Sequence, residues 1–328
     1  MKELVKENIN ELEIGQTQYI LVLVKSIENA ATRNGVPYQK LTVRDAHEHE
    51  VPFFNWDSPI SLPIPTVARV QVETREYKSE QSYKFICCEE AAGANIEVFL
   101  PKGNIDSKKA WSDLVEICCG STKTQTTGIR FTLRKIVGGI LMDQSKKFRS
   151  RPLTKSDSYS RRSGIIEATL NLVKAAEAMA DIQPLDHDLI IAGAMLYYIG
   201  NVNTINDVYA ETPDDILLTA GNIASDLILL KSVDLKSDDN LEEAIDDEDI
   251  RLLRHIVTSR FKGIKAAIPE AVVLRYLDTA LQETDLTFTS MKEMEYGSMT
   301  TNNRLFNNRL YKREPISEDA QENTISVA

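Results

Sequence analysis

The hydrophobic pattern of this 328-residue chain changes its period near residue 107. Before that point apolar and polar residues alternate, which places successive side chains on opposite faces of a strand. After it, apolar residues recur every three or four positions, the spacing of one face of a helix. A chain of this length can bury two separate cores. We therefore expect a multidomain protein, with an all-β unit first and an all-α unit second.

Five segments of the first hundred residues have the composition and alternation of strands. They are residues 19–25, 38–43, 51–56, 66–74 and 82–88. Asn34-Gly35 lies between the first two and is a turn dipeptide typical of hairpins. Five short strands with hairpin signals predict a small closed barrel, and the OB-fold is the common barrel of this size that ends in a helical partner.

Aromatic and cationic residues on the second and third of these strands form one candidate nucleic-acid site. Aromatic faces stack on bases and cations attract phosphates, although about half of the aromatic side chains must fill the barrel interior. The candidates are Tyr38, Lys40, Arg44 and Trp56, with Phe53 as an alternative to Trp56. His47 and His49 stand two apart at a predicted hairpin tip, but without a third ligand we expect a solvated loop there and not a metal site.

The helical part is predicted from apolar residues at helical spacing. The expected helices cover residues 107–119, 163–182, 188–199, 213–232, 250–261 and 269–281. The segment 188–199 is nearly continuous in apolar residues and is expected to be the buried central helix. The acidic residues 246–249 precede the fifth helix, where carboxylates favour the positive end of the helix dipole. The tail 312–328, rich in Glu, Ser and Asn, is expected to be disordered.

Charge is distributed unevenly along the chain, whose net charge is −11. Residues 101–165 hold 14 basic against 5 acidic side chains, whereas residues 166–328 hold 14 against 29. A basic stripe attracts a phosphate backbone because bound phosphates release counterions. The candidate phosphate contacts in this stripe are Arg130, Arg134, Lys146, Lys147, Arg149 and Arg151. The alternative is that the basic segment lies against the acidic helices and is neutralised there, and both interpretations remain open.

Several classes of protein are disfavoured by composition. No run of about 18 apolar residues could span a membrane, and the N-terminus lacks the pattern of a signal peptide. We expect a cytoplasmic protein without membrane association. The four cysteines form two adjacent pairs, Cys87-Cys88 and Cys118-Cys119, and lack the spacing that lets two thiolates share a zinc ion. We therefore expect reduced thiols, no metal and no cofactor.

A common order and spacing links residues 24–26, 34–38, Asp45 and 56–57 in the barrel with residues 163–166, 180–189, Gly193, Gly200, 255–259 and 269–278 in the helical part. With a β-barrel followed by this set of helices, the chain resembles the YhaM-type 3′-to-5′ exoribonucleases, which join an OB-fold to an HD domain. The resemblance covers most of the chain and is weakest over residues 101–160. The resemblance implies a helical domain that binds divalent metal ions to activate water against a phosphodiester.

The metal-binding positions implied by this resemblance are occupied here by other residue types. The family's first histidine falls on Ala168 or its neighbour Glu167, and its His-Asp doublet falls on Tyr197 and Tyr198. Its later histidine pair falls on Arg260 and Phe261, and its lysine after the doublet falls on Asn201. Only Asp278 is kept, with His255 nearby. One carboxylate and one imidazole cannot hold two metal ions, so we expect a degenerate pocket that lacks this chemistry.

Four segments and three functions follow from these patterns. The expected segments are an OB-like barrel (1–100), a basic helical connection (101–162), an HD-like helical domain (163–311) and the tail (312–328). We favour a non-catalytic protein that binds single-stranded RNA or DNA. One alternative is a structural or assembly protein acting through protein partners or as a homo-oligomer. The other is an active exoribonuclease or phosphohydrolase with an atypical site that uses Asp278, His255, Glu167 and a carboxylate such as Asp207.

Overall fold

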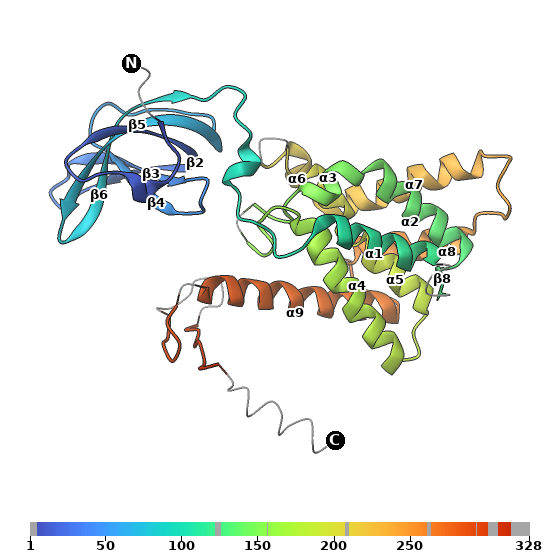
Figure 1. The fold of residues 1–328 in the computed structure, drawn as a ribbon. Coiled ribbons are helices and arrows are strands. Elements are labelled where there is room, and N and C mark those ends of the chain that lie inside the picture. Colours follow the sequence, from blue (N-terminus) through green and yellow to red (C-terminus); the bar gives the residue numbers. More distant parts are fainter. Residues whose placement is uncertain are drawn as a thin grey trace.

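The N-terminal part of the computed structural model is a closed β-barrel (Figure 1). The structure describes residues 5–121, 126–155, 157–206, 210–260, 264–292, 294–300 and 308–315. Within these ranges the barrel strands are β2 (Thr17–Ala31), β3 (Pro37–Arg44), β4 (Glu50–Asn55), β5 (Thr66–Tyr77) and β6 (Glu80–Glu90). The short strand β1 (Val5–Lys6) pairs in parallel with β2. Each barrel strand overlaps one of the five predicted segments, with Trp56 one residue beyond the end of β4, so the alternating pattern located all five strands.

The long strand β2 closes the barrel by pairing along both of its edges. Its first half, Thr17 to Val24, is antiparallel to β5, and its second half, Leu23 to Ala31, is antiparallel to β3. A register shift between Val24 and Ser26 bends the strand between the two halves. The strand order around the barrel is β2-β3-β4-β6-β5 and back to β2, with β4 and β6 parallel. This is a five-stranded Greek-key barrel of the predicted OB type.

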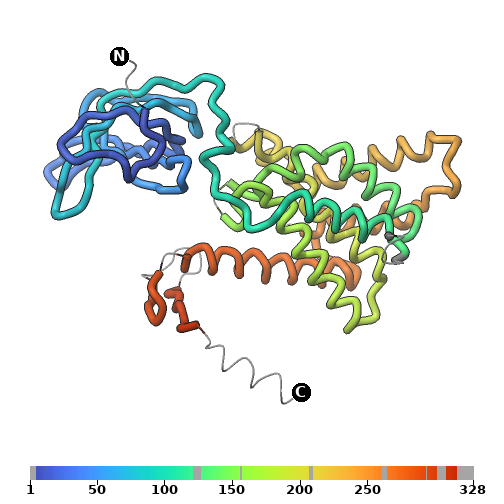
Figure 2. Tube along the Cα trace, in the orientation of Figure 1, coloured from blue at the N-terminus to red at the C-terminus, as the bar shows by residue number. Residues whose placement is uncertain are grey.

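The C-terminal part is helical and is packed around one apolar core (Figure 2). Its first helices are α1 (Ser107–Cys119), α2 (Phe131–Asp143) and α3 (Ser145–Ser150), followed by α4 (Gly164–Ile182), α5 (His187–Leu196) and the 3-10 turn η3 (Ile199–Asn203). The chain continues through α6 (Pro213–Leu217), α7 (Thr219–Lys236), α8 (Asp247–Thr258) and α9 (Pro269–Met291). A two-stranded ribbon, β7 (Gly120–Ser121) with β8 (Thr126–Thr127), follows α1. Helix α5 is buried from Leu189 to Leu196, in agreement with its expected central place.

Helix α2 belongs to the core of the helical part. The sequence predicted only a connecting segment over residues 101–162. Leu133, Ile136, Val137 and Ile140 of α2 are each at most 2% exposed. Helices α1 and α3 contribute to the same core. The expected division at residue 163 therefore does not coincide with a division in the packing, because the apolar face of α2 is buried among the later helices.

A third, smaller apolar cluster joins the barrel to the helical part. It contains Leu23 and Val67 of the barrel, Ile96 and Phe99 of the 3-10 turn η2 (Ile96–Phe99), and Ile205 after η3. Polar contacts add to it at the β3–β4 turn, where the Glu48 carboxylate accepts a hydrogen bond from the Lys102 amide at 2.8 Å. These contacts give the two parts a shared interface between residues distant in the sequence.

Two expectations from the sequence concern the ends and the membrane. The predicted tail 312–328 lies outside the described residues from 316 onward. In the described part, residues 297 and 312 are joined by a backbone hydrogen bond and Met299 bridges to Tyr311. Among the described residues, no helix combines the length and apolarity needed to cross a membrane.

Candidate functional site

A groove of about 600 Å³ on the outer face of the barrel contains two of the predicted aromatic residues. The rings of Tyr38 and Trp56 are stacked with centroids 4.7 Å apart, and Phe54 lies 6.0 Å from Tyr38. Trp56 is 44% exposed and Tyr77, on the opposite wall, is 64% exposed. The exposed faces of these rings offer the kind of platform on which nucleobases stack.

The strand register places cations beside these rings. Lys40 is opposite Phe54 across β3 and β4, and Phe54 is opposite Lys84 across β4 and β6. Side chains directly opposite one another share a face of the sheet. Lys84 and Arg75 both line the groove, although Arg75 also pairs with Glu73 at 2.7 Å. The face therefore combines aromatic surface with positive charge, as binding of a single strand requires.

Two other barrel candidates are placed elsewhere by the structure. The Phe53 side chain is fully buried and packs against Tyr83 inside the barrel, so Trp56 and not Phe53 belongs to the outer face. Arg44 lies six residues along β3 from Tyr38, about 20 Å at the rise of a strand. Its guanidinium pairs with Glu50 at 2.7 Å, and Glu50 also pairs with Lys25. Arg44 is thus neutralised locally and lies away from the groove.

Part of the groove is formed by the end of the β5–β6 hairpin, which lies beyond the strands predicted from the sequence. Strands β5 and β6 extend to Tyr77 and Glu80, beyond the predicted segments, and are joined through Lys78 and Ser79. Both turn residues have positive φ, 54° and 65°, as a two-residue hairpin turn of this hand requires. Residues 75–77 are all exposed and lack an apolar alternation, so the sequence offered no periodic signal for this extension, which adds Arg75 and Tyr77 to the lining of the groove.

The loop with His47 and His49 forms a hydrogen-bonded turn around a carboxylate. The Asp45 side chain is fully buried and accepts hydrogen bonds from the amides of Ile9, His47 and His49 and from the His49 ring. Burial raises the pKa of Asp45, but these donors outweigh it and hold the pKa below 3.8. The two histidines therefore belong to a structured turn.

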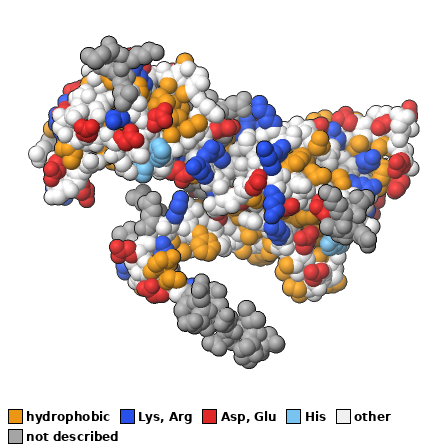
Figure 3. Space-filling model, in the orientation of Figure 1, with side chains coloured by type: hydrophobic (Ala, Val, Ile, Leu, Met, Phe, Trp, Pro, Cys, Tyr) orange, Lys and Arg blue, Asp and Glu red, His pale blue; other side chains and the backbone are white. Residues whose placement is uncertain are grey.

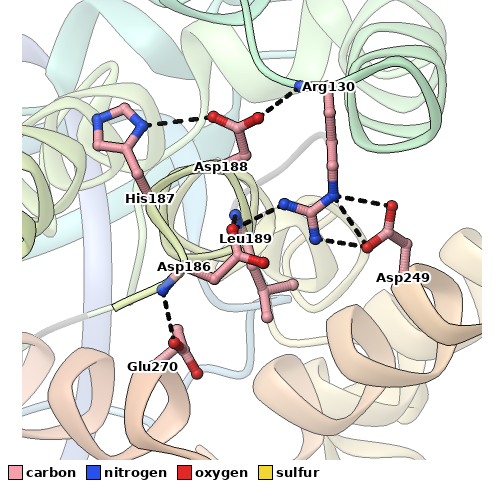
Figure 4. Close-up of polar contacts among 7 residues, drawn as sticks. All are labelled: Arg130, Asp186, His187, Asp188, Leu189, Asp249 and Glu270. Atoms are coloured by element: carbon pink, nitrogen blue, oxygen red, sulfur yellow. Dashed lines mark hydrogen bonds and ion pairs between the residues drawn. The ribbon is translucent and has the colours of Figure 1, made fainter. Parts of the chain in front are cut away.

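Arg130 of the basic segment is engaged by carboxylates of the helical part (Figure 4). Its guanidinium donates to Asp249 at the start of α8 and, at 2.7 Å, to Asp186 before α5. Its backbone amide donates to the Asp188 carboxylate at 2.9 Å. Arg130 thus links the first turns of α2, α5 and α8, and the internal neutralisation considered for this segment applies to it.

Two more arginines of the basic segment point into the protein. Arg151 is 6% exposed and donates to the backbone carbonyls of Val202 and Ile205. Arg161 is 9% exposed and pairs with Glu167 at 2.7 Å and with Asp285 at 2.6 Å. Arg151 was expected to contact phosphates, and this expectation is wrong. Its side chain is buried against the backbone at and after η3 and is not accessible to a phosphate.

The other candidates of the basic segment are nearer to solvent. Lys146 is exposed, whereas Lys147 donates to the Asn203 side chain at 3.2 Å. Arg134 and Arg149 are half-buried beside the rings of Phe131 and Trp111. Figure 3 shows basic and acidic side chains interspersed on the near face of the helical part. The structure therefore does not gather the six basic candidates into one surface.

The degenerate pocket predicted from the resemblance is a polar cluster in the helical core. The Tyr198 hydroxyl donates to the Asp278 carboxylate at 2.5 Å, and the two residues are 0% and 7% exposed. The same carboxylate accepts a hydrogen bond from the Gln282 amide, and the Arg260 guanidinium lies 3.6 Å from its second oxygen. Arg260 also donates to Asn201 at 2.9 Å. Four candidates, Tyr198, Asn201, Arg260 and Asp278, are thus brought together.

Tyr197 completes this cluster without a hydrogen bond from its hydroxyl. Its ring meets that of Tyr198 edge-on at 5.4 Å, and the Arg260 guanidinium lies 5.4 Å from its centroid. The Tyr197 side chain is 1% exposed, and its hydroxyl has no hydrogen-bond partner among the described residues. Burial is the main cause that raises the pKa of both tyrosines, and the Asp278 charge adds to it. Both phenols are therefore neutral at physiological pH.

Two candidates have other surroundings, and two positions are outside the described ranges. Ala168 is fully buried in the apolar core on α4. The His255 Nε2 accepts a hydrogen bond from the Ala267 amide at 2.9 Å, and its ring lines a groove between α7 and α8. Phe261 and Asp207 lie outside the described residues. The cluster around Asp278 is thus smaller than the set expected from the sequence.

The side chains around Asp278 do not fit a divalent metal ion. Tyr198, Gln282 and Arg260 all direct protons toward the carboxylate, and a neutral phenol is a poor ligand. In the part of the chain that the structure describes, no three His, Cys, Asp or Glu side chains lie close enough together to share a metal ion. The Asp278 carboxylate is therefore the acceptor of a local network of polar groups.

Comparison with known proteins identifies relatives over nearly the whole chain. The 3′-5′ exoribonuclease YhaM of Bacillus licheniformis is 21% identical over 313 residues, which cover 91% of this chain and 95% of the relative. YhaM of Bacillus subtilis is 21% identical over 303 residues, and YhaM of Listeria welshimeri is 20% identical over 298. The chain is therefore a distant relative of the YhaM 3′-5′ exoribonucleases, and the resemblance predicted from its motifs is confirmed.

Two further comparisons add little. No family model matches the chain. The second OB-fold domain of replication protein A from Methanococcus maripaludis is 13% identical, covers 28% of this chain and 98% of its own, and has a TM-score of 0.23. A score of this size carries no argument, so the assignment of the barrel rests on its strand order and register.

Proposed function

We propose that this protein binds single-stranded nucleic acid, RNA before DNA, in the groove of the barrel face. The stacked pair of Tyr38 and Trp56 is the observation that carries the proposal. A duplex keeps its bases stacked inside, whereas a single strand can place its bases on exposed rings. The relatives are named exoribonucleases, and this favours RNA as the ligand.

The chemistry of the groove matches one strand of a nucleic acid. Trp56 and Tyr77 supply exposed rings on its two walls, and Lys84 supplies a cation on its floor. A groove of about 600 Å³ is of the size that takes one or a few small groups, which is consistent with one or two stacked nucleotides. The remaining phosphates of a longer strand would extend toward solvent and toward Lys40 on the same face.

We propose further that the bound strand is not hydrolysed at the Asp278 cluster. The support is that the Asp278 carboxylate is already occupied by Tyr198, Gln282 and Arg260. To become a metal ligand it would have to give up the hydrogen bond from a buried hydroxyl and the ion pair with a guanidinium, which costs several kcal/mol by order of magnitude. The proposed role of the helical part is that of a scaffold for the barrel.

Intrinsic fluorescence gives a direct test of the groove, because the chain has two tryptophans. Trp111, which packs beside Phe148 in the helical part, is first changed to Phe so that emission reports Trp56 alone. Titration with a 12-nucleotide oligouridylate should quench this emission, since a base stacks on the exposed face of the indole. An equal titration with a duplex of the same length should quench it far less.

Affinity measured by fluorescence anisotropy of a labelled oligouridylate tests the contribution of the stack. Trp56→Ala should weaken binding about 5- to 150-fold, the effect of about 1–3 kcal/mol for one stacked base. The matched control is Tyr276→Ala on α9, an aromatic residue that is 65% exposed and distant from the barrel in sequence. Equal losses in both variants, or no quenching of Trp56, would refute the assignment of the groove.

The alternative is that the chain retains the activity in its relatives' names. Incubation of the labelled oligonucleotide with protein and either Mg²⁺ or Mn²⁺ separates the two possibilities on a sequencing gel. We expect a strand of unchanged length. Release of single nucleotides that Asp278→Asn abolishes would overturn the non-catalytic part and leave the binding groove untouched.

A further inference from the structure

Helices α7 and α8 form a hairpin with a row of exposed apolar side chains along its outer face. On α7, Leu229, Leu230 and Val233 are 39%, 63% and 54% exposed. Their spacing places them together on one face of the helix. Leu229 and Val233 also line a groove of about 550 Å³ between the two helices, with Ile250 of α8 on its other wall. Exposed apolar residues that gather beside a groove mark a surface for another molecule.

The same groove carries positive charge in an otherwise acidic part of the chain. Lys236, Arg251 and Arg254 line it, and Asp247 is the carboxylate among its lining residues. Lys236 pairs with Asp247, and Arg254 donates from Nε to the Ser225 hydroxyl at 2.9 Å. The arginines therefore leave net positive charge on one rim. Residues 166–328 hold 14 basic against 29 acidic side chains, so this rim contrasts with its surroundings.

Complementary charge lies at the tip of the same hairpin. The segment 237–246 connects α7 to α8, and its carboxylates are exposed at Asp239, Glu242 and Glu243. Figure 3 shows acidic side chains at this end of the molecule, next to apolar ones along the hairpin. The hairpin thus presents an acidic tip and, behind it, the apolar row of α7 side by side with Arg251 and Arg254 of α8.

Such an arrangement is self-complementary under a two-fold rotation. When two hairpins pack antiparallel with the axis at Val233 and Ile250, each acidic tip lies beside the other hairpin's Arg251 and Arg254. The distances agree, because Arg254 is seven residues from Asp247 on α8, about 10 Å at the rise of a helix. Val233 and Ile250 then lie nearest the axis and face their copies, with Leu229 and Leu230 about one turn away. A two-fold interface requires this matching of one surface patch with itself.

We propose that the α7–α8 hairpin is the homodimer interface of this protein and that a second copy of the chain covers the groove. The inference is independent of the barrel groove and of nucleic-acid binding. The charge pattern favours a second copy over a different protein, because every group that complements the rim is present on the same hairpin.

Light scattering coupled to size-exclusion chromatography tests this with the full chain. The wild type at about 50 µM should have twice the mass of one chain. Leu230→Glu should reduce the mass to that of one chain, because it places one carboxylate of each copy against the apolar row near the two-fold axis. Ile182→Glu, at the 71% exposed end of α4, is the matched control and should remain dimeric.

A charge exchange makes the test specific for the proposed pairing. The rim variant Arg251→Glu and a tip variant with Asp239→Lys, Glu242→Lys and Glu243→Lys should each be monomeric alone. Mixed in equal amounts, the two variants should form a heterodimer. In it, one tip–rim contact is native and the other joins the lysine tip to the glutamate introduced at position 251, and retention on an affinity tag carried by one variant detects it. All four positions are exposed, so folding is expected to be retained, and the far-ultraviolet circular dichroism spectrum checks it.

Three outcomes would overturn the proposal. They are a monomeric wild type at about 50 µM, a Leu230→Glu variant that remains dimeric, and rim and tip variants that stay apart when mixed. A monomeric wild type would leave the groove to a different partner. Because Leu230 lies on α7 and the aromatic groove on the barrel, loss of the dimer with unchanged oligonucleotide binding separates this inference from the proposed function.

Discussion

The two adjacent tyrosines of the helical core should respond in opposite directions to loss of their hydroxyl groups. In Tyr198→Phe the ring is kept, so no cavity forms, and the change removes one hydrogen bond to the Asp278 carboxylate. A hydrogen bond to a charged group contributes about 1.5–3 kcal/mol. Arg260 and Gln282 still contact Asp278, so we expect a loss of about 2 kcal/mol in the free energy of unfolding.

Tyr197→Phe is the matched control for this change. Its hydroxyl is buried without a hydrogen-bond partner among the described residues, and a buried, unpaired hydroxyl opposes folding by about 1–3 kcal/mol. Removing it should leave stability unchanged or raise it by up to about 1 kcal/mol. The two variants differ from the wild type by one oxygen atom each and lie in the same core.

Urea unfolding followed by circular dichroism measures both variants against the wild type. For a helical part of this size, 2 kcal/mol corresponds to about 4–8 °C in Tm, which calorimetry resolves. If Tyr197→Phe destabilises the protein as much as Tyr198→Phe, the hydrogen-bond assignment is wrong. If Tyr198→Phe lowers the free energy of unfolding by less than about 0.5 kcal/mol, the hydrogen bond to Asp278 does not stabilise the fold as we expect.

Three further predictions concern the barrel and the close packing of η3. Lys84→Gln should flatten the dependence of log affinity on log salt concentration by about 0.7 for a single-stranded oligonucleotide, and an unchanged slope would remove Lys84 from the contact. The lowered pKa of Asp45 gives stability that is present above pH 3.8 and is lost as the pH falls through the folded value, so Asp45→Asn should show less acid-dependent loss in unfolding titrations below that pH. Gly200→Ala should destabilise the helical part by about 1–3 kcal/mol, because a Cβ there would collide with the Ala220 carbonyl oxygen, and a wild-type Tm would contradict this.

The barrel was predictable from the sequence because its pattern is local. Alternation in 38–43 and 66–74 reflects one face that is buried and one that is not, and the structure buries Leu41, Val43, Val70 and Val72 accordingly. Tyr38 was found for the same reason, whereas the sequence left Phe53 and Trp56 as alternatives and the structure places Trp56 on the outer face. The contribution of Tyr77 was not found, because it depends on how far the hairpin extends past the barrel.

The roles of the basic residues were not predictable, because they depend on partners far away in the sequence. Arg130 is held by Asp249, 119 positions later, and Arg161 by Asp285, 124 positions later. A local charge count cannot distinguish such arginines from Lys146, which is exposed. Helix α2 was missed for a related reason, since Gly138 and Gly139 weaken its helical signal while its apolar face is defined only by the packing.

The double pairing of β2 also determines when the barrel can form during synthesis. Thr17 pairs with Glu73 and Val24 with Thr66, so the edge of β2 that pairs with β5 has no partner until the chain has been made through β5. A ribosome adds about 5–20 residues per second, and several seconds therefore pass with an apolar strand edge unpaired. The hairpin of β2 with β3 is complete much earlier and leaves that edge open to other chains. Conditions that slow translation between β4 and β5 should therefore increase aggregation of the nascent chain, whereas slowing within the helical part should have little effect.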